Sequence, residues 1–297
     1  MAPTVEAIRA GLCRLSRRRE LRLYGVLRSW LRGSAGGIML VVKGEISCWD
    51  RSGSRPSLTS SGKGVQINHP QTTARVFGVL FLITFITSIP AYFFYVPVLD
   101  DPRYIVGAGA DTRVSFGAFL ELLLIIANIG TAVVLYPIVR RQNEILALGY
   151  VTARIVECVF IAVGILSLLT VVTLRQEAAA GADSGSLVAL GESLVALHNW
   201  TRQLGPGFVV GVGNGLILGY LMYTSRLVPR GMAVLGLIGG PLIIVTGTAV
   251  LLGVLEEGGV WQVAVIPEFL WELSLGIWPI VRGFNPSAIA RLEHESP

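Results

Sequence analysis

Seven polar or charged side chains lie inside long apolar stretches of the sequence. They are Glu121, Asn128, Arg154, Glu157, Asn214, Glu268 and Glu272. An unpaired charge in hydrocarbon costs roughly 2.5–3.5 kcal/mol on membrane-insertion scales, so residues of this kind need a partner or a role. Buried carboxyl groups can carry protons or hold cations, and amide groups can coordinate a solute. We therefore treat the seven as a candidate intramembrane polar site.

The spacing of these residues places several of them in pairs on a common helix face. The pairs are Glu121 with Asn128, seven residues apart; Arg154 with Glu157, three apart; and Glu268 with Glu272, four apart. Oppositely charged side chains three apart on a helix can pair. One interpretation is a continuous polar path through a helical bundle. The other is structural: Arg154 neutralises an acid, and the amides bridge neighbouring helices.

Six apolar stretches are long enough to carry these residues across a bilayer. A hydrocarbon core about 30 Å thick needs about 20 residues of helix, and the chain is 53% hydrophobic and only 14% charged. The predicted spans are 76–99, 115–139, 150–174, 207–224, 232–255 and 263–281. The stretches are too long for strands and do not alternate apolar with polar residues. They predict an all-α membrane protein, a bundle of six transmembrane helices.

Glycines recur at helical spacing in the fourth and fifth predicted spans. They are Gly207, Gly211, Gly215, Gly219, Gly236 and Gly240. A glycine stripe allows another helix to approach closely. The sequence therefore predicts tight helix packing, either within one chain or between copies in a homo-oligomer or with a membrane partner.

The remaining segments divide the chain into an arm, a membrane domain (75–290) and a short tail (291–297). Residues 1–74 hold 12 Lys and Arg against 4 Asp and Glu, whereas the rest of the chain holds 12 against 15. The arm is expected to be poorly ordered. It is either a basic amphipathic segment on anionic lipid or the product of a wrongly chosen start codon. The negative balance of the membrane domain argues against nucleic-acid binding.

Arginines in the short connections predict the orientation. With the N-terminus inside, the inner side receives Arg75, Arg140, Arg141, Arg226, Arg230, Arg282 and Arg291. Cytoplasmic loops are enriched in Lys and Arg, so both termini are expected in the cytoplasm. On the outer side, the leucines of 187–197 repeat at helical spacing and predict a helix lying at the interface. Nearby, His198 is either an outer proton acceptor or an ordinary interfacial residue.

No cofactor, metal or enzyme motif stands out. The three cysteines and three histidines are scattered, without metal-ligand spacing. We find no HExxH pair, no GxSxG elbow and no phosphate-binding loop. The sequence therefore predicts no cofactor and no metal site, and an enzyme is less favoured than a transporter or a structural module.

Three strings carry a resemblance to a known family. They are GADTRVSFGAFLELLLIIANIGTAVVLYPIVRRQNEILALGYVTARIVE, LVPRGMAVLGLIGGPL and IWPIVRGFNPSAI. Over about residues 75–289 the chain resembles the bacterial membrane family catalogued as domain of unknown function 4386. The resemblance implies a multi-pass protein of the bacterial inner membrane, with no activity, substrate or catalytic residue to carry over. The arm lies outside it.

Three functions are compatible with these features. The first is a small transporter or proton-coupled permease, whose acids handle protons or a cation and whose amides coordinate substrate. The second is a non-catalytic membrane module that assembles through its glycine-rich faces. The third is an intramembrane enzyme that uses an acid pair such as Glu268 and Glu272, and it is the least supported.

Overall fold

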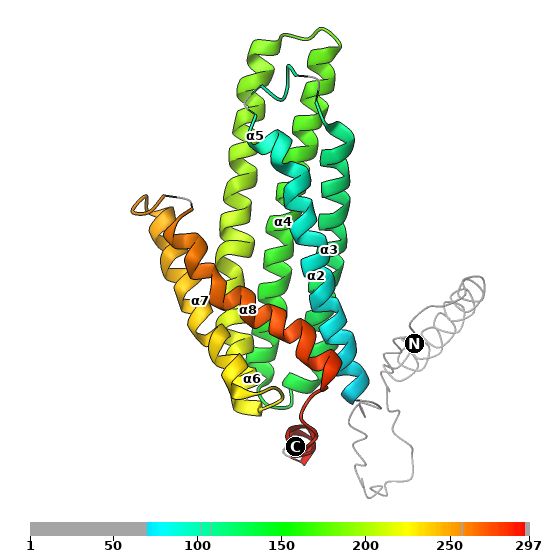
Figure 1. The fold of residues 1–297 in the computed structure, drawn as a ribbon, viewed down its shortest axis with the longest axis vertical. Coiled ribbons are helices and arrows are strands. Elements are labelled where there is room, and N and C mark those ends of the chain that lie inside the picture. The colour runs from blue at the N-terminus through cyan, green and yellow to red at the C-terminus, as the bar shows by residue number, and fades with distance from the viewer. Residues whose placement is uncertain (1–69, 102, 108, 257, 295–297) are drawn as a thin grey trace, which may run out of the picture. The chain divides into compact units, whose positions relative to one another are not determined.

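The computed structural model describes residues 70–294 except 102, 108 and 257, and these residues are mostly helical, with no strand (Figure 1). The predicted arm, 1–74, lies almost wholly outside the described residues. Within this described part of the chain, six helices are long and apolar enough to cross a membrane. They are α2 (Pro70–Leu99), α3 (Asp111–Val139), α4 (Glu144–Ala179), a continuous helix over Ser184–Ser225, α7 (Arg230–Leu251) and α8 (Val260–Val281). The predicted all-α, six-span architecture is confirmed.

The helix ends differ from the predicted span ends for local reasons. At the start of α4, Asn143 caps the helix by accepting a hydrogen bond from Leu146 N at 2.9 Å, so the helix begins six residues before the apolar run. Conversely, α7 ends at Leu251, four residues before the predicted end of its span. The chain turns there because Gly253 takes a left-handed φ of 69°.

The fourth span differs most from the expectation. We expected a separate outer helix, but α5 (Ser184–Leu204) continues through η2 (Gly205–Val209) and η3 (Gly211–Leu218) into α6 (Gly219–Ser225). The segments η2 and η3 are π-helical. Pro206 opens the first of them, and wider turns tolerate its missing N–H group. α5 packs along α4, and Ser167 Oγ of α4 donates a hydrogen bond to Leu194 O of α5 at 2.6 Å.

The helices pack as two groups that meet at one end. α2 packs against α3, α3 against α4, and α4 against α5, while α7 packs against η3 and α8. α8 meets α2 where a Cβ on Gly78 would lie 2.7 Å from Gly276 O. Away from that crossing, α7 and α8 diverge from α2–α5 (Figure 1).

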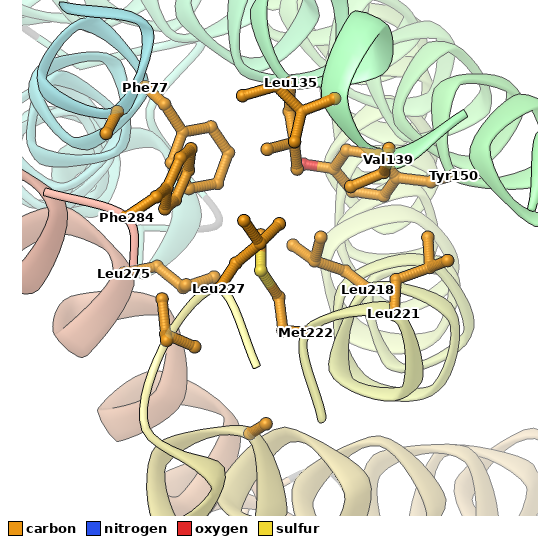
Figure 2. Packing of buried hydrophobic residues seen from close by; sticks show 14 of the residues in the cluster. Phe77, Leu135, Val139, Tyr150, Leu218, Leu221, Met222, Leu227, Leu275 and Phe284 are labelled. Carbon is orange, nitrogen blue, oxygen red and sulfur yellow. The ribbon is translucent and has the colours of Figure 1, made fainter. Parts of the chain in front are cut away.

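A hydrophobic cluster fills the end where the groups meet. Phe77, Leu135, Tyr150 and Leu275 are fully buried there, and Figure 2 shows them surrounding Met222. The terminal helix α9 (Pro286–His294) adds three buried side chains to the same cluster. The cluster closes this end of the bundle.

A polar contact fastens the opposite end. Arg175, at the end of α4, forms an ion pair with Asp111 at the start of α3, at 2.5 Å. Tyr104, in the connection before α3, donates to Asp111 Oδ1 at 2.9 Å. Burial, together with this hydrogen bond, raises the pKa of Tyr104 to about 12. The connection is thereby held over the ends of α3 and α4.

Candidate functional site

A cavity of about 490 Å³ lies among α2, α3, α4, α5, α7 and α8. We call it the acid-lined cavity. Six of the seven candidate residues line it, namely Glu121, Asn128, Arg154, Glu157, Glu268 and Glu272. The seventh, Asn214, reaches it from η3 by donating a hydrogen bond to Glu272. The structure therefore brings all seven residues together.

Arg154 is the centre of a buried network. Its Nη1 lies 2.7 Å from Glu157 Oε2, and its Nη2 lies 4.0 Å from Glu272 Oε1. The guanidinium also lies over the Phe81 ring, 5.1 Å from its centroid. Asn128 Nδ2 donates to Glu157 Oε1 at 3.0 Å. The network links α2, α3, α4 and α8 through one cation and two carboxylates.

Glu268 lies beside this network but outside it. Its side chain is 2% exposed, and neither carboxyl oxygen has a hydrogen-bond partner among the described residues. The carboxyl group rests against two glycines, since a Cβ on Gly215 or Gly239 would lie 2.9 or 2.8 Å from Oε2. The missing side chains therefore create the space that Glu268 occupies. An unpartnered buried carboxyl group is costly and needs a proton or a cation.

The rest of the cavity wall carries polar and aromatic groups. Tyr95 donates to Glu121 Oε2 at 2.8 Å. Arg202 lies between two rings, 5.8 Å from the centroid of Tyr92 and 5.9 Å from that of Trp261. Guanidinium groups favour the faces of aromatic rings. Arg202 is thus held in the wall of the cavity, away from the network at Arg154.

The predicted packing glycines lie at close contacts within the chain. An added Cβ would lie 2.8 Å from Gly240 O at Gly211, 2.4 Å from Gly240 Cα at Gly215, and 2.6 Å from Gly211 O at Gly240. At Gly236 it would lie 2.6 Å from Trp271. At Gly219 and Gly207 the nearest atoms are farther away, 3.3 Å to Leu237 N and 3.1 Å to Trp261. Real Cβ atoms essentially never approach a neighbour closer than 3.0 Å. Much of the stripe is therefore used to join η3 and α7 within the chain.

Sequence reasoning missed several cavity residues. Tyr95, Arg202 and Trp261 line the cavity but were not among the candidates. Behind the lining, Trp271 donates a hydrogen bond from Nε1 to Asn214 O at 3.0 Å. Tyr and Trp near predicted span ends are a usable signal, but the sequence does not show which of them face inward. His198 lines the cavity, with its ring edge-on to Tyr95 at 5.6 Å between centroids.

The chemistry of the cavity is ionic. Within the described part of the chain, no group of three or more His, Cys, Asp and Glu residues is arranged to hold a metal ion. Four carboxyl groups line the cavity against two guanidinium groups, those of Arg154 and Arg202. The arrangement can bind a cation or carry a proton.

Six apolar helices of membrane-spanning length around a polar cavity define the class, which is a multi-pass membrane protein. Residues 76–283 match the family described as Domain of unknown function (DUF4386), and the chain belongs to that family. No curated protein and no solved structure matches the chain.

Proposed function

We propose that the chain is a small transporter that exchanges protons for an organic cation in the acid-lined cavity. The observation that carries the proposal is the buried carboxyl group of Glu268, which has no partner among the described residues. The charges of the cavity support it, because the two carboxylates near Arg154 already face that single guanidinium. Glu268 is therefore available to pair with a proton or with a cation that enters the cavity.

The exchange follows from the cost of burying charge. In the empty cavity, Glu268 keeps its proton, since an unpaired carboxylate in a site of low dielectric is unfavourable. When a cation enters, the O–H bond of the carboxyl group breaks and the proton leaves to water. The carboxylate then pairs with the cation. Protons and the solute therefore compete for the same group.

The mouth of the cavity favours a lipophilic cation. Ile89, Tyr92, Phe93 and Phe269 line the cavity and are each more than 40% exposed. These residues lie on α2 and α8, the helices that separate towards one end of the bundle. Aromatic faces attract organic cations, and small-molecule sites usually measure about 300–1,000 Å³. A ligand could therefore enter from the lipid between the two helices.

Transport also requires the other end of the bundle to open. The cluster around Met222 closes that end (Figure 2). The π-helical turns of η2 and η3, and Pro267 and Pro279 inside α8, are places where helices bend. Interrupted helices beside a mid-membrane site are a known transporter device. We propose that these segments move when the cavity changes sides.

As part of the same proposal, the chain lies in a bacterial inner membrane with both termini in the cytoplasm. The end of the bundle that carries the start of α2 and the end of α8 holds Arg75, Arg140, Arg141, Arg226, Arg230, Arg282 and Arg291, against Glu144 and Glu293 among the described residues. The opposite end holds most of the loop acids. This distribution follows the positive-inside rule.

Proton release on binding tests the proposal directly. Purified full-length protein in weakly buffered detergent is titrated with tetraphenylphosphonium, and the pH and the heat of binding are recorded together. We expect about one proton to leave per bound cation, because one carboxyl group changes partner. Glu268→Gln should abolish the release. Glu177→Gln, which removes an exposed acid at the end of α4, should leave it unchanged.

Two results of this titration would contradict the proposal. If tetraphenylphosphonium, tetramethylammonium and guanidinium all fail to bind, the cavity is not a cation site. If a cation binds without releasing protons, or if Glu268→Gln releases them as before, exchange at Glu268 is excluded. In proteoliposomes, a pH gradient should drive tetraphenylphosphonium uptake by the native protein and not by Glu268→Gln.

A further inference from the structure

A second hollow, of about 470 Å³, lies at the arginine-rich end of the bundle. It is formed by the turn between α6 and α7 and by the connection between α8 and α9, and its lining includes Arg226, Arg230, Arg282 and Trp278. We call it the arginine hollow. No acidic residue is among its lining residues. Nothing in the proposed exchange at Glu268 uses it.

The hollow has a fixed frame. Asn285 N donates to Leu227 O at 3.0 Å and ties the two connections together. Leu227 and Phe284 are fully buried, and Figure 2 shows both pointing into the hydrophobic cluster. Arg291 adds a hydrogen bond from Nη2 to Ser225 O at 2.6 Å. The backbone that presents the arginines is therefore held by the core of the protein.

The frame presents uncompensated positive charge. Within the described residues, neither Arg226 nor Arg282 has an ion-pair partner, and both are exposed. Arg226 also takes a φ of 59°, a left-handed conformation that is rare for residues other than glycine. Arg230 is held over the Tyr223 ring, 4.8 Å from its centroid. Like charges gathered without a counter-charge favour binding of an anion.

We infer that the arginine hollow binds the phosphate group of an anionic lipid. The planar fork of a guanidinium matches two phosphate oxygens, and several such groups together recognise phosphate well. The lipid source follows from position. Arg282 comes directly after Val281, and Val281 and Ile277 of α8 are exposed apolar side chains next to the hollow. They offer a surface for acyl chains, and Trp278 is suited to headgroup depth.

The experiment compares two double variants with the same loss of charge. Arg226→Gln with Arg282→Gln removes two arginines of the hollow. Arg75→Gln with Arg140→Gln removes two exposed arginines at the same end of the bundle that do not line it. Purified full-length proteins are mixed with phosphatidylglycerol or phosphatidylcholine and analysed by native mass spectrometry. A melting curve for each protein checks that it is folded.

We expect the hollow variant to lose phosphatidylglycerol affinity by at least about tenfold, the scale of one charge-assisted hydrogen bond. The control variant should stay close to the native protein, and phosphatidylcholine should bind weakly to all three. An equal loss in both variants would show general attraction to a basic end and overturn the site. Displacement of the lipid by millimolar inorganic phosphate would assign the hollow to a soluble phosphate instead. These outcomes do not depend on proton exchange at Glu268.

Discussion

The acid-lined cavity and the arginine hollow have nearly equal volumes, about 490 and 470 Å³, but opposite charge and burial. In the cavity, Arg154 is buried and its contacts with Glu157 and Glu272 replace the water it has lost. In the hollow, Arg226 and Arg282 are exposed, so water solvates them in the absence of a ligand. The same residue type is thus part of the folded framework in one place and available for binding in the other.

Because the two regions differ in burial, their charged side chains should contribute differently to the stability of the protein. Removing one member of a buried pair leaves the other charged and without solvent, which is strongly destabilising. Removing an exposed charge usually changes stability little. Substitutions in the cavity should therefore affect folding or exchange, and substitutions in the hollow should affect ligand binding alone.

The largest effect is expected from Arg154→Leu. The change leaves the buried Glu157 and the partly buried Glu272 without their shared cation, and the loss of the Glu157 partner alone should cost about 3–5 kcal/mol. We expect the protein to disappear from the membrane fraction or to elute from a sizing column as aggregate. Arg282→Gln removes the same charge from the hollow and should leave yield and melting temperature close to native. An Arg154→Leu protein as stable as the native one would contradict the proposed difference between the two regions.

Glu272→Gln should separate function from folding. The glutamine keeps an oxygen that can accept from Asn214, so the contact between α8 and η3 survives. It removes the second carboxylate near Arg154, which changes the electrostatics beside Glu268. We expect normal insertion and purification with loss of pH-driven tetraphenylphosphonium uptake. If the variant fails to accumulate, the residue holds the bundle together, and its part in exchange is withdrawn.

The six spans and most of the polar cavity residues could be predicted from the sequence. Apolar run length identified the six spans, because a bilayer imposes that length on any helix that crosses it. The cost of charge in lipid singled out the seven polar residues. The three-residue spacing of Arg154 and Glu157 predicted their contact, which the structure has at 2.7 Å.

Other features depend on contacts between distant segments. The continuous helix through η2 and η3 could not be predicted, because hydropathy does not distinguish a π-helical turn from a break at Pro206. Sequence spacing also does not show that Arg202 enters the cavity wall. The arginine hollow joins connections 58 residues apart, at Leu227 and Asn285. The residue pattern of one segment does not show which distant segment it contacts.

A smaller effect is expected from Gly215→Ala, which tests the contact between η3 and α7 beside Glu268. The added Cβ would lie 2.4 Å from Gly240 Cα and 2.9 Å from Glu268 Oε2. Overpacking of this kind costs about 1–3 kcal/mol, and it should also weaken tetraphenylphosphonium binding. Gly149→Ala is the matched control, since its Cβ would meet only Ile217 Cδ1 at 3.5 Å. Melting curves and calorimetry on both variants check this, and equal behaviour would argue against the tight η3–α7 contact.

The smallest effect is expected from Arg175→Gln. Arg175 is intermediate between the two regions, since it is paired like Arg154 but partly exposed to solvent. Arg175 is paired with Asp111, as Arg154 is with Glu157, but both side chains of that pair are more than 15% exposed. Ion pairs that water reaches contribute about 1 kcal/mol and weaken with salt, as the Debye length falls from about 10 Å at 0.1 M to about 3 Å at 1 M. We expect a small drop in melting temperature in dilute salt that shrinks in concentrated salt. A drop as large as that of Arg154→Leu, or one that salt leaves unchanged, would mean that pairing rather than burial sets the cost.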